Sequence, residues 1–245
     1  MVFFFIILFE PQVGNCKTMC VYPCYLHTLL NMKKETILEK YMNHVLEHGS
    51  EPVSVFQFCK KIKIDEAEFY AVFNSFDAVR SWFWEHVFHT TVTLLKEDET
   101  YKEYAASEKL SAFYFLWTQQ LLSHRSFVLQ HAHKTMKGIL PTDRNLMGFR
   151  KVFLSYADEI VRNGIENREV AERKFISDRF KDALWVQTVF LLNFWIKDTS
   201  KGFEATDAAI EKSVTLGFKL MGENMLDQVF DFGKFMFQNM REKMA

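Results

Sequence analysis

Two histidines one helical turn apart, with a glutamate between them, are the residues of this chain whose spacing could do chemistry. The segment His44-Val-Leu-Glu47-His48 has the order of an inverted zinc-protease motif, in which both imidazoles bind zinc and the glutamate acts as the base. Such a site needs a third ligand from elsewhere in the chain. The same residues also fit the polar face of an amphipathic helix, and we assign no zinc site to them.

Other potential metal ligands and catalytic groups are spaced less well. Cys16, Cys20 and Cys24 could align three thiols on one helical face as a soft-metal site, but no Cys-x-x-Cys and no paired histidine accompanies them. His131 and His133 are two residues apart on a predicted helix and so point in different directions. The sequence has no glycine-rich phosphate loop, no Gly-x-Ser-x-Gly elbow and no Cys/His nucleophile pair. We therefore predict a protein that is not an enzyme and binds no cofactor or metal.

The composition is that of a globular protein with one large core or two modest ones. Of the 245 residues, 49% are hydrophobic and 16% aromatic. The 30 Lys and Arg residues are balanced by 31 Asp and Glu residues, so that any contact with nucleic acid has to be local. Only nine Gly and four Pro interrupt the chain, and apolar residues recur at three- and four-residue spacing. These features predict an all-α fold.

The apolar periodicity places the helices. It predicts a first helix that ends at His48-Gly49, a second from the cap Ser54 to about Lys61, a third from Asp65 to near Phe73, and a long fourth to about Leu95. Later helices are predicted over about 107–122, 146–162, 170–196, 206–221 and 226–240, with a further one ending before Gly138. The first three form a compact unit with a short turn between the second and third.

The first 31 residues differ from the rest. Their apolar run, residues 1–9, is too short to span a bilayer and lacks the features of a secretory signal. A sequence typical of a cytoplasmic N-terminus starts at Met32, and we predict that residues 1–31 are a disordered leader or an upstream translation artefact. Without them one cysteine remains, Cys59, which fits a reducing cytoplasm.

The segment 54–79 resembles the helix-turn-helix of the TetR family of transcriptional regulators. The residues that fall in register with the family pattern are Ser54, Phe58, Cys59, Ile62, Ile64, Phe69, Tyr70 and Phe73. The tail from Trp195 to Lys234 also looks like the C-terminal domain of a branch of this family. The resemblance implies a helix-turn-helix domain over 32–80 and a C-terminal helical domain over 81–245 that binds an effector and dimerises.

Several exposed positions depart from the family pattern. The recognition helix opens with Asp65, Glu66 and Glu68, where the family has small, hydroxylated or basic residues that face phosphates and base edges. Phe76 stands where the family tends to have a lysine. Residues 32–95 contain seven Lys and Arg against nine Asp and Glu. Three clustered carboxylates repel the phosphate backbone, although a single one can accept a hydrogen bond from cytosine.

The residues left for a DNA contact form a short basic cluster with polar neighbours. Lys60, Lys61 and Lys63 would bind phosphates, Ser54 and Tyr70 would add neutral contacts, and Glu66 and Glu68 open the helix that faces the bases. The lysines fit a solvated helix face equally well.

The C-terminal domain is predicted to hold the effector site and the dimer interface. Aromatic residues on its helices could line an apolar cavity, or form ordinary core: Phe113, Tyr114, Trp117, Trp185 and Phe190. The helices over 178–196 and 206–221 are where the family builds a two-fold four-helix interface.

Two functions remain open from the sequence. The first is a cytoplasmic, homodimeric regulator that binds double-stranded DNA and responds to an apolar small molecule, without insertion in a membrane. The second is a TetR-fold protein that has lost DNA binding and binds a small molecule or lipid.

Overall fold

A computed structural model of the protein describes residues 21–132, 142–173 and 177–222. Their secondary structure is helical throughout, as predicted, and within these residues there are no strands. The elements are α1 (Val21–His48), α2 (Val55–Ile62), α3 (Glu66–Tyr70), α4 (Phe76–Glu97), η1 (Glu99–Glu103), α5 (Ala106–Leu122), α6 (Arg125–Ala132), η2 (Arg144–Leu146), α7 (Met147–Glu166), α8 (Ser177–Lys197), η3 (Lys201–Phe203) and α9 (Glu204–Met221). The predicted helix over 226–240 lies outside the described residues.

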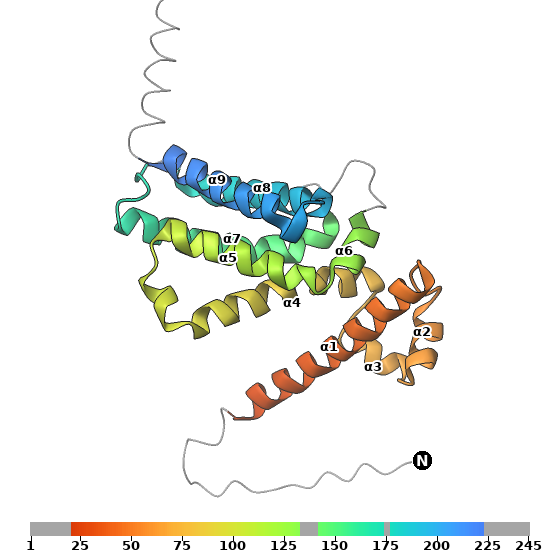
Figure 1. The fold of residues 1–245 in the computed structure, drawn as a ribbon. Helices are drawn as coiled ribbons and strands as arrows, with labels where there is room; N and C mark the ends of the chain where they lie inside the picture. Colours follow the sequence, from red (N-terminus) through yellow and green to blue (C-terminus); the bar gives the residue numbers. More distant parts are fainter. Residues whose placement is uncertain (1–20, 133–141, 174–176, 223–245) are drawn as a thin grey trace, which may run out of the picture.

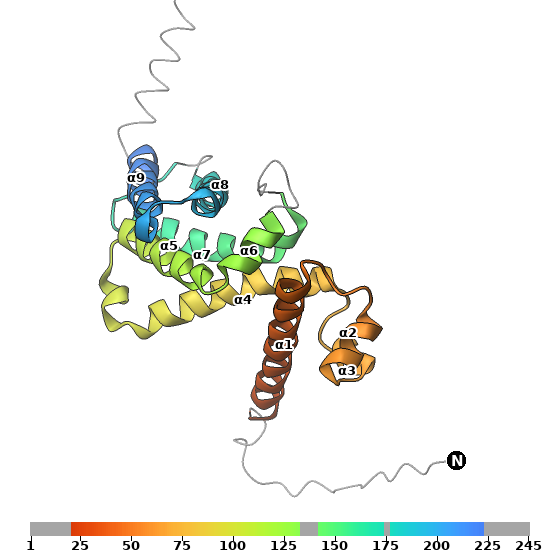
Figure 2. The ribbon, with the colours of Figure 1, turned by 45° about the vertical axis from the view of Figure 1, so that its right-hand side comes forward.

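The helices form a small N-terminal unit and a layered C-terminal domain (Figures 1 and 2). Helices α1, α2 and α3 stand at one end of α4, and α1 contacts both α4 and α6. In the larger domain α4 packs on α5 and α7, while α8 and α9 lie side by side on the opposite face of that pair. Because α4 belongs to both parts, it connects the N-terminal unit to the larger domain.

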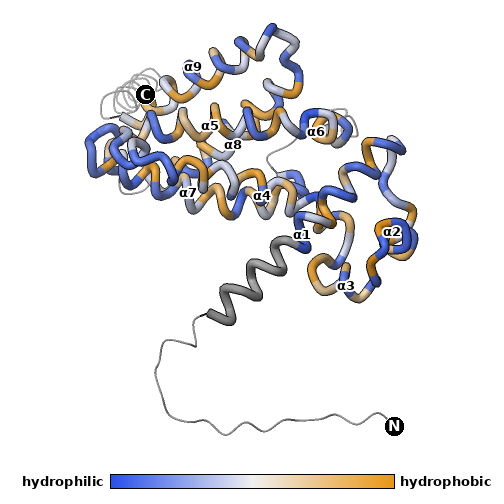
Figure 3. The backbone as a smooth tube through the Cα atoms, turned by 60° about the horizontal axis from the view of Figure 1, so that its bottom comes forward, coloured by the Kyte–Doolittle hydropathy of each residue, from blue (hydrophilic) through white to orange (hydrophobic). Residues whose placement is uncertain are grey.

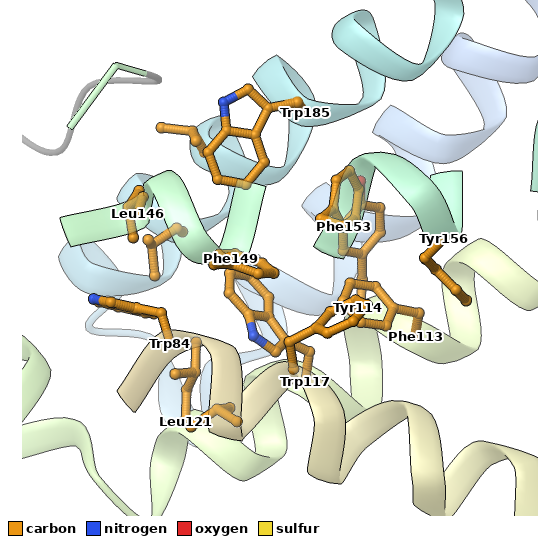
Figure 4. Packing of buried hydrophobic residues seen from close by; sticks show 14 of the residues in the cluster. Trp84, Phe113, Tyr114, Trp117, Leu121, Leu146, Phe149, Phe153, Tyr156 and Trp185 are labelled. Atoms are coloured by element: carbon orange, nitrogen blue, oxygen red, sulfur yellow. The ribbon is translucent and has the colours of Figure 1, made fainter. Parts of the chain in front are cut away.

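Each helix buries one side and exposes the other. Figure 3 shows hydrophobic and hydrophilic residues alternating along α4 and α9, as expected for helices with one buried face. The core of the larger domain is aromatic (Figure 4): the rings of Phe149 and Trp117 have centroids 5.3 Å apart, and those of Phe149 and Trp185 are 5.2 Å apart. Large rings from α5, α7 and α8 thus fix the spacing of the layers.

The helix boundaries that differ most from the prediction are the start of α8 and the start of α1. The helix predicted over 170–196 does not include residues 170–173, because Val170 is buried against Gly164 and the Ala171 amide donates to the Met221 carbonyl at 2.9 Å; the structure describes α8 from Ser177. Residues 170–173 therefore form a bend and an irregular connection instead of a helix. At the other end of the chain, residues 21–31, predicted to belong to a leader, continue the first helix. Residues 1–20 lie outside the described part.

The connection between α8 and α9 is held by a buried carboxylate and an arginine. Asp198 accepts hydrogen bonds from the Ser200 amide at 2.8 Å and from the Thr206 amide and hydroxyl at 2.9 and 2.6 Å. Arg125 on α6 donates to the carbonyls of Trp195 and Asp198 at the end of α8. These bonds satisfy backbone groups at both helix ends and fix the angle between the two helices.

Candidate functional site

The helix-turn-helix predicted from the sequence is present, with its turn held by local bonds. Ser54 caps α2, because its hydroxyl oxygen accepts from the Gln57 amide at 3.2 Å. Lys63 follows α2 in the left-handed conformation, with φ of 59°, and the Ile64 amide donates to the Cys59 carbonyl at 3.1 Å. Phe58 and Phe69 are buried beneath the turn, which fixes α3 across α2.

The three predicted lysines have different surroundings. Lys60 and Lys63 are exposed to solvent. The Lys61 ammonium instead turns toward α1, where Nζ lies 3.5 Å from His44 Nδ1, 3.3 Å from His48 Nε2 and 3.7 Å from the Glu47 carboxylate. Lys60 and Lys63 are therefore the members of the basic cluster that are available for phosphate.

The acidic residues of α3 are exposed, and one of them has a partner. Asp65, Glu66 and Glu68 all face solvent. Glu68 lies 3.5 Å from the ammonium of Lys33 on α1. Because α3 has only five residues, these carboxylates make up most of its outer surface, next to Tyr70, whose side chain is 54% exposed.

Phe76 takes part in the core of the helix-turn-helix unit. Its ring stacks on Tyr41 of α1 with centroids 5.3 Å apart and meets the edges of Phe58 and Phe69 at 5.5 and 5.8 Å. A lysine here would lose these contacts, so the departure from the family pattern serves packing between α1, α2, α3 and α4.

Sequence reasoning missed Arg80 on α4, the residue with the most polar partners around this unit. Its guanidinium binds Glu51 at 2.6 Å, Asp77, the Tyr41 hydroxyl at 3.3 Å and Asn145 Oδ1 at 3.4 Å. Only 12% of the side chain is exposed. The one available signal was that Arg80 is the sole arginine in residues 32–95. Arg80 thus joins α1 and the linker before α2 to η2 of the larger domain.

Within the described residues, His44 and His48 of the zinc-protease motif have no third metal ligand near them. His44 and His48 stack with centroids 4.2 Å apart, and the Lys61 ammonium occupies the space to which both lone pairs point. Across the described parts of the chain, no group of three His, Cys, Asp or Glu side chains is placed to hold a metal ion. Cys16, Cys20 and His133 lie outside these parts.

Of the five aromatic residues that could line a cavity or form ordinary core, four are packed in the core. Phe113, Tyr114, Trp117 and Trp185 are each at most 2% exposed. The Tyr114 hydroxyl is hydrogen bonded to Thr188 at 3.0 Å. Phe190 is separate from them: 54% of it is exposed, on the outer face of α8. The same 3.6-residue periodicity places apolar residues on both sides of this helix.

A cavity of about 540 Å³ opens elsewhere, between the end of α4, η1, the start of α5 and the second half of α7. None of the five predicted pocket residues lines it. Its lining residues are Lys96, Tyr101, Lys102, Lys109, Tyr156, Glu159, Ile160, Arg162, Asn163 and Glu166. Charged side chains surround a floor of two buried tyrosines, so this cavity is more polar than the one predicted.

The outer face of α8 and α9 exposes a group of large apolar side chains. We call it the α8/α9 face and define it by Val186, Phe190, Phe194, Leu216 and Leu220, which are 36–54% exposed. The two helices are also joined by a hydrogen bond from Gln187 to Ser213 at 3.0 Å. Within the described residues, no helix is long and apolar enough to cross a membrane.

The comparison with protein families agrees with the helical architecture. The family described as tetracyclin repressor-like, C-terminal domain, matches residues 109–236. Among solved structures, a protein with unknown function from Rhodococcus sp. RHA1 is similar, with 11% identity over 78% of this chain and 96% of that one and a TM-score of 0.49. No curated protein matches the chain. Because the family match covers more than half of the 245 residues, the chain belongs to the tetracyclin repressor-like (TetR) family.

Proposed function

We propose that this protein is a cytoplasmic, homodimeric transcriptional regulator that binds double-stranded DNA and responds to a small molecule. The observation that carries the proposal is the intact helix-turn-helix, capped by Ser54 and closed by the left-handed Lys63, at one end of a helix that continues into the larger domain. Such a helix transmits displacements between an effector site and a DNA-binding unit. We expect no enzymatic activity.

The DNA contact would rest on few residues. Lys60 and Lys63 are free to bind phosphates, and Ser54 and Tyr70 can add neutral contacts from the same unit. Glu66 and Glu68 would then face base edges, where carboxylates accept from the amino group of cytosine. The three carboxylates repel the phosphates, so the affinity for DNA should be low. Selectivity for sequence should then depend mainly on the contacts with the bases.

The α8/α9 face is our proposed dimer interface. Its exposed Phe190, Phe194 and Leu216 would be an aggregation risk on a monomer, whereas a two-fold axis buries the same surface on both subunits. A dimer also sets the spacing of two recognition helices, which have to reach successive major grooves.

A gel-shift titration against the DNA that flanks its own gene tests the regulator. We expect a specific complex at low salt that weakens as salt rises, since each phosphate contact releases counterions. Absence of a specific complex at low salt, where the phosphate term is strongest, would rule out the proposal.

The alternative is a TetR-fold protein that has lost DNA binding and retains only the ligand-binding domain. The acidic surface of α3 favours it, together with Phe76, whose packing leaves no lysine at the position that holds a phosphate in the family. The same gel shift separates the two functions, because the alternative predicts ligand binding without any specific DNA complex.

A further inference from the structure

Two tyrosine hydroxyls form the floor of the cavity between α4, η1, α5 and α7. They can accept a hydrogen bond from a ligand, but neither has a free proton to donate to it. The hydroxyls of Tyr101 and Tyr156 lie 2.8 Å apart, and the Tyr156 hydroxyl also donates to the Lys109 carbonyl at 3.3 Å. Each hydroxyl has one proton. Since Tyr156 gives its proton to the carbonyl, Tyr101 gives its proton to Tyr156. The Tyr101 oxygen keeps its lone pairs for a donor that enters the cavity.

A carboxylate lies close to this pair of tyrosines. Burial raises the pKa of both Tyr101 and Tyr156, and the negative charge of Glu159 on α7 raises both further. Glu159 lines the cavity and forms no ion pair with another described residue. Acceptor oxygens beside an unpaired carboxylate are the surroundings that an ammonium group prefers.

Two cations are available on the other walls. Lys109 donates to Asn163 Oδ1 at 3.0 Å, and this amide leaves its charge uncompensated. Lys96 at the end of α4 has no acidic partner among the described residues. The remaining basic lining residues already have acidic partners: Lys102 pairs with Glu99 and Arg162 with Asp158, both at 3.1 Å, although Asp158 also binds Lys181. Lys96 and Lys109 are therefore placed to bind a carboxylate.

The buried part of the lining is largely apolar. Ile160 is 3% exposed, and the rings of Tyr101 and Tyr156 are 7% exposed each. The cavity volume of about 540 Å³ suits a small ligand with one aromatic or branched body. We propose that this cavity binds a zwitterion of the aromatic amino-acid type, with its ammonium at Tyr101 and Glu159 and its carboxylate at Lys96 and Lys109.

The cavity lies at one end of α4, so a bound ligand could change the position of the N-terminal unit at the other end. This inference rests on the proposed regulatory function. Lys96 lies at the C-terminal end of α4, and Arg80 lies near the other end of the same helix. Sixteen residues at 1.5 Å each separate them by about 24 Å along a continuous helix. A ligand that draws Lys96 toward α7 tilts α4 and displaces the Arg80 contacts that hold α1 and the linker.

Calorimetric titration of the full chain with three matched probes tests the site. Phenylalanine carries both charges, 2-phenylethylamine only the ammonium and 3-phenylpropionate only the carboxylate. We expect phenylalanine to bind about tenfold more tightly than either of the others, because each charge has its own partner. Equal affinity for all three, tighter binding of a singly charged probe, or no binding of any probe would overturn the proposal.

Two variants test which residues bind the ammonium group of the ligand and which bind its carboxylate. Glu159→Gln should weaken phenylalanine and phenylethylamine about tenfold and leave phenylpropionate unchanged, whereas Lys109→Met should weaken phenylalanine and phenylpropionate instead. Glu103→Gln, at an exposed residue of η1 outside the lining, is the matched control. Circular dichroism checks the fold of each variant. If every variant binds all probes as the parent does, the site is wrong.

The ligand titration and the gel shift test the two proposals independently. Probe binding without a DNA complex would contradict the proposed regulator and leave the ligand site in place. A specific DNA complex without probe binding would contradict only the ligand site.

Discussion

Arg80 and Asn145 join the helix-turn-helix unit to the larger domain: Nε of Arg80 on α4 donates to Oδ1 of Asn145 in η2 at 3.4 Å. The same guanidinium binds Glu51 and the hydroxyl of Tyr41, whose pKa rises to about 12, chiefly through burial. One side chain therefore contacts α1, the linker before α2 and η2. A movement of α4 has to change these contacts together.

Replacing Arg80 should destabilise the protein more than replacing its exposed partner. Arg80→Met removes the guanidinium that binds Glu51, the Tyr41 hydroxyl and Asn145, and we expect a loss of about 3 kcal/mol in the free energy of unfolding. Asp77→Asn should cost under about 1 kcal/mol, since that carboxylate is 78% exposed. Urea denaturation measures both. Similar losses for the two variants would contradict the central role of Arg80.

Asp198 should make stability depend on pH in the acidic range. Burial alone would raise its pKa, but hydrogen bonds from Thr206 and Ser200 lower it to about 2. A pKa lowered on folding stabilises the protein above the unfolded pKa of about 4, and that contribution is lost as pH falls toward 2. Asp198→Asn should remove this dependence, as seen in urea midpoints between pH 5 and 2. An unchanged profile in the variant would exclude Asp198 as its source.

Three histidines should weaken the fold as pH falls through neutrality. Burial lowers the pKa of His44, His86 and His124. Neighbouring positive charges lower the pKa of His44 and His124 further, whereas the negative charge of Glu35 offsets part of the effect on His86. The unfolded chain then binds more protons, so stability is complete above a pH of about 6.5 and declines below it. Urea midpoints at pH 7.5 and 5.5 measure the change. His124→Gln should make it smaller, and a higher midpoint at pH 5.5 would contradict the sign.

Charge on the α8/α9 face should separate the subunits. Phe190→Glu places carboxylates against one another across the proposed two-fold axis, and we expect a monomer in light scattering at micromolar concentration. Leu94→Glu on α4 is the control, because Leu94 is also exposed, at 40%, but lies on a different helix from this face. A parent protein that is already monomeric, or a variant that stays dimeric, would refute the interface.

The lysines of α2 should contribute unequally to DNA binding. Lys60→Ala should weaken the complex for every sequence and reduce the salt slope by about one counterion. Lys61→Ala should have less effect, because Nζ of Lys61 is held by His44 and His48 of α1. Gel-shift titrations at several salt concentrations measure both slopes. A larger change for Lys61 would mean that its ammonium leaves α1 in the complex.

The helix-turn-helix could be predicted because its signals are local. Ser54 accepts a bond from a backbone amide three residues away, and the left-handed Lys63 closes the turn with a bond to Cys59. Such contacts depend only on nearby residues, and the apolar spacing of Phe58 and Phe69 marks the buried side.

The roles of the site residues depend on contacts with residues that are far away in the sequence. A local sequence pattern does not predict such contacts. Phe76 is a core residue because Tyr41, 35 positions earlier, stacks on it, and Arg80 acquires its role from Glu51 and Asn145. Phe190 has the same residue type and helical spacing as the core aromatics, yet it lies on a side of α8 that the described helices leave exposed.

The cavity also depends on contacts between residues that are distant in the sequence. Its walls come from α4, η1, α5 and α7, and the pairing of Tyr101 with Tyr156 joins residues 55 positions apart. The sequence by itself determined the helices, the turn and the family, because caps and periodicity act within a few residues. Only the tertiary structure decided which aromatics fill the core and which charges stay unpaired around a cavity, because burial and pairing depend on helices that meet in space.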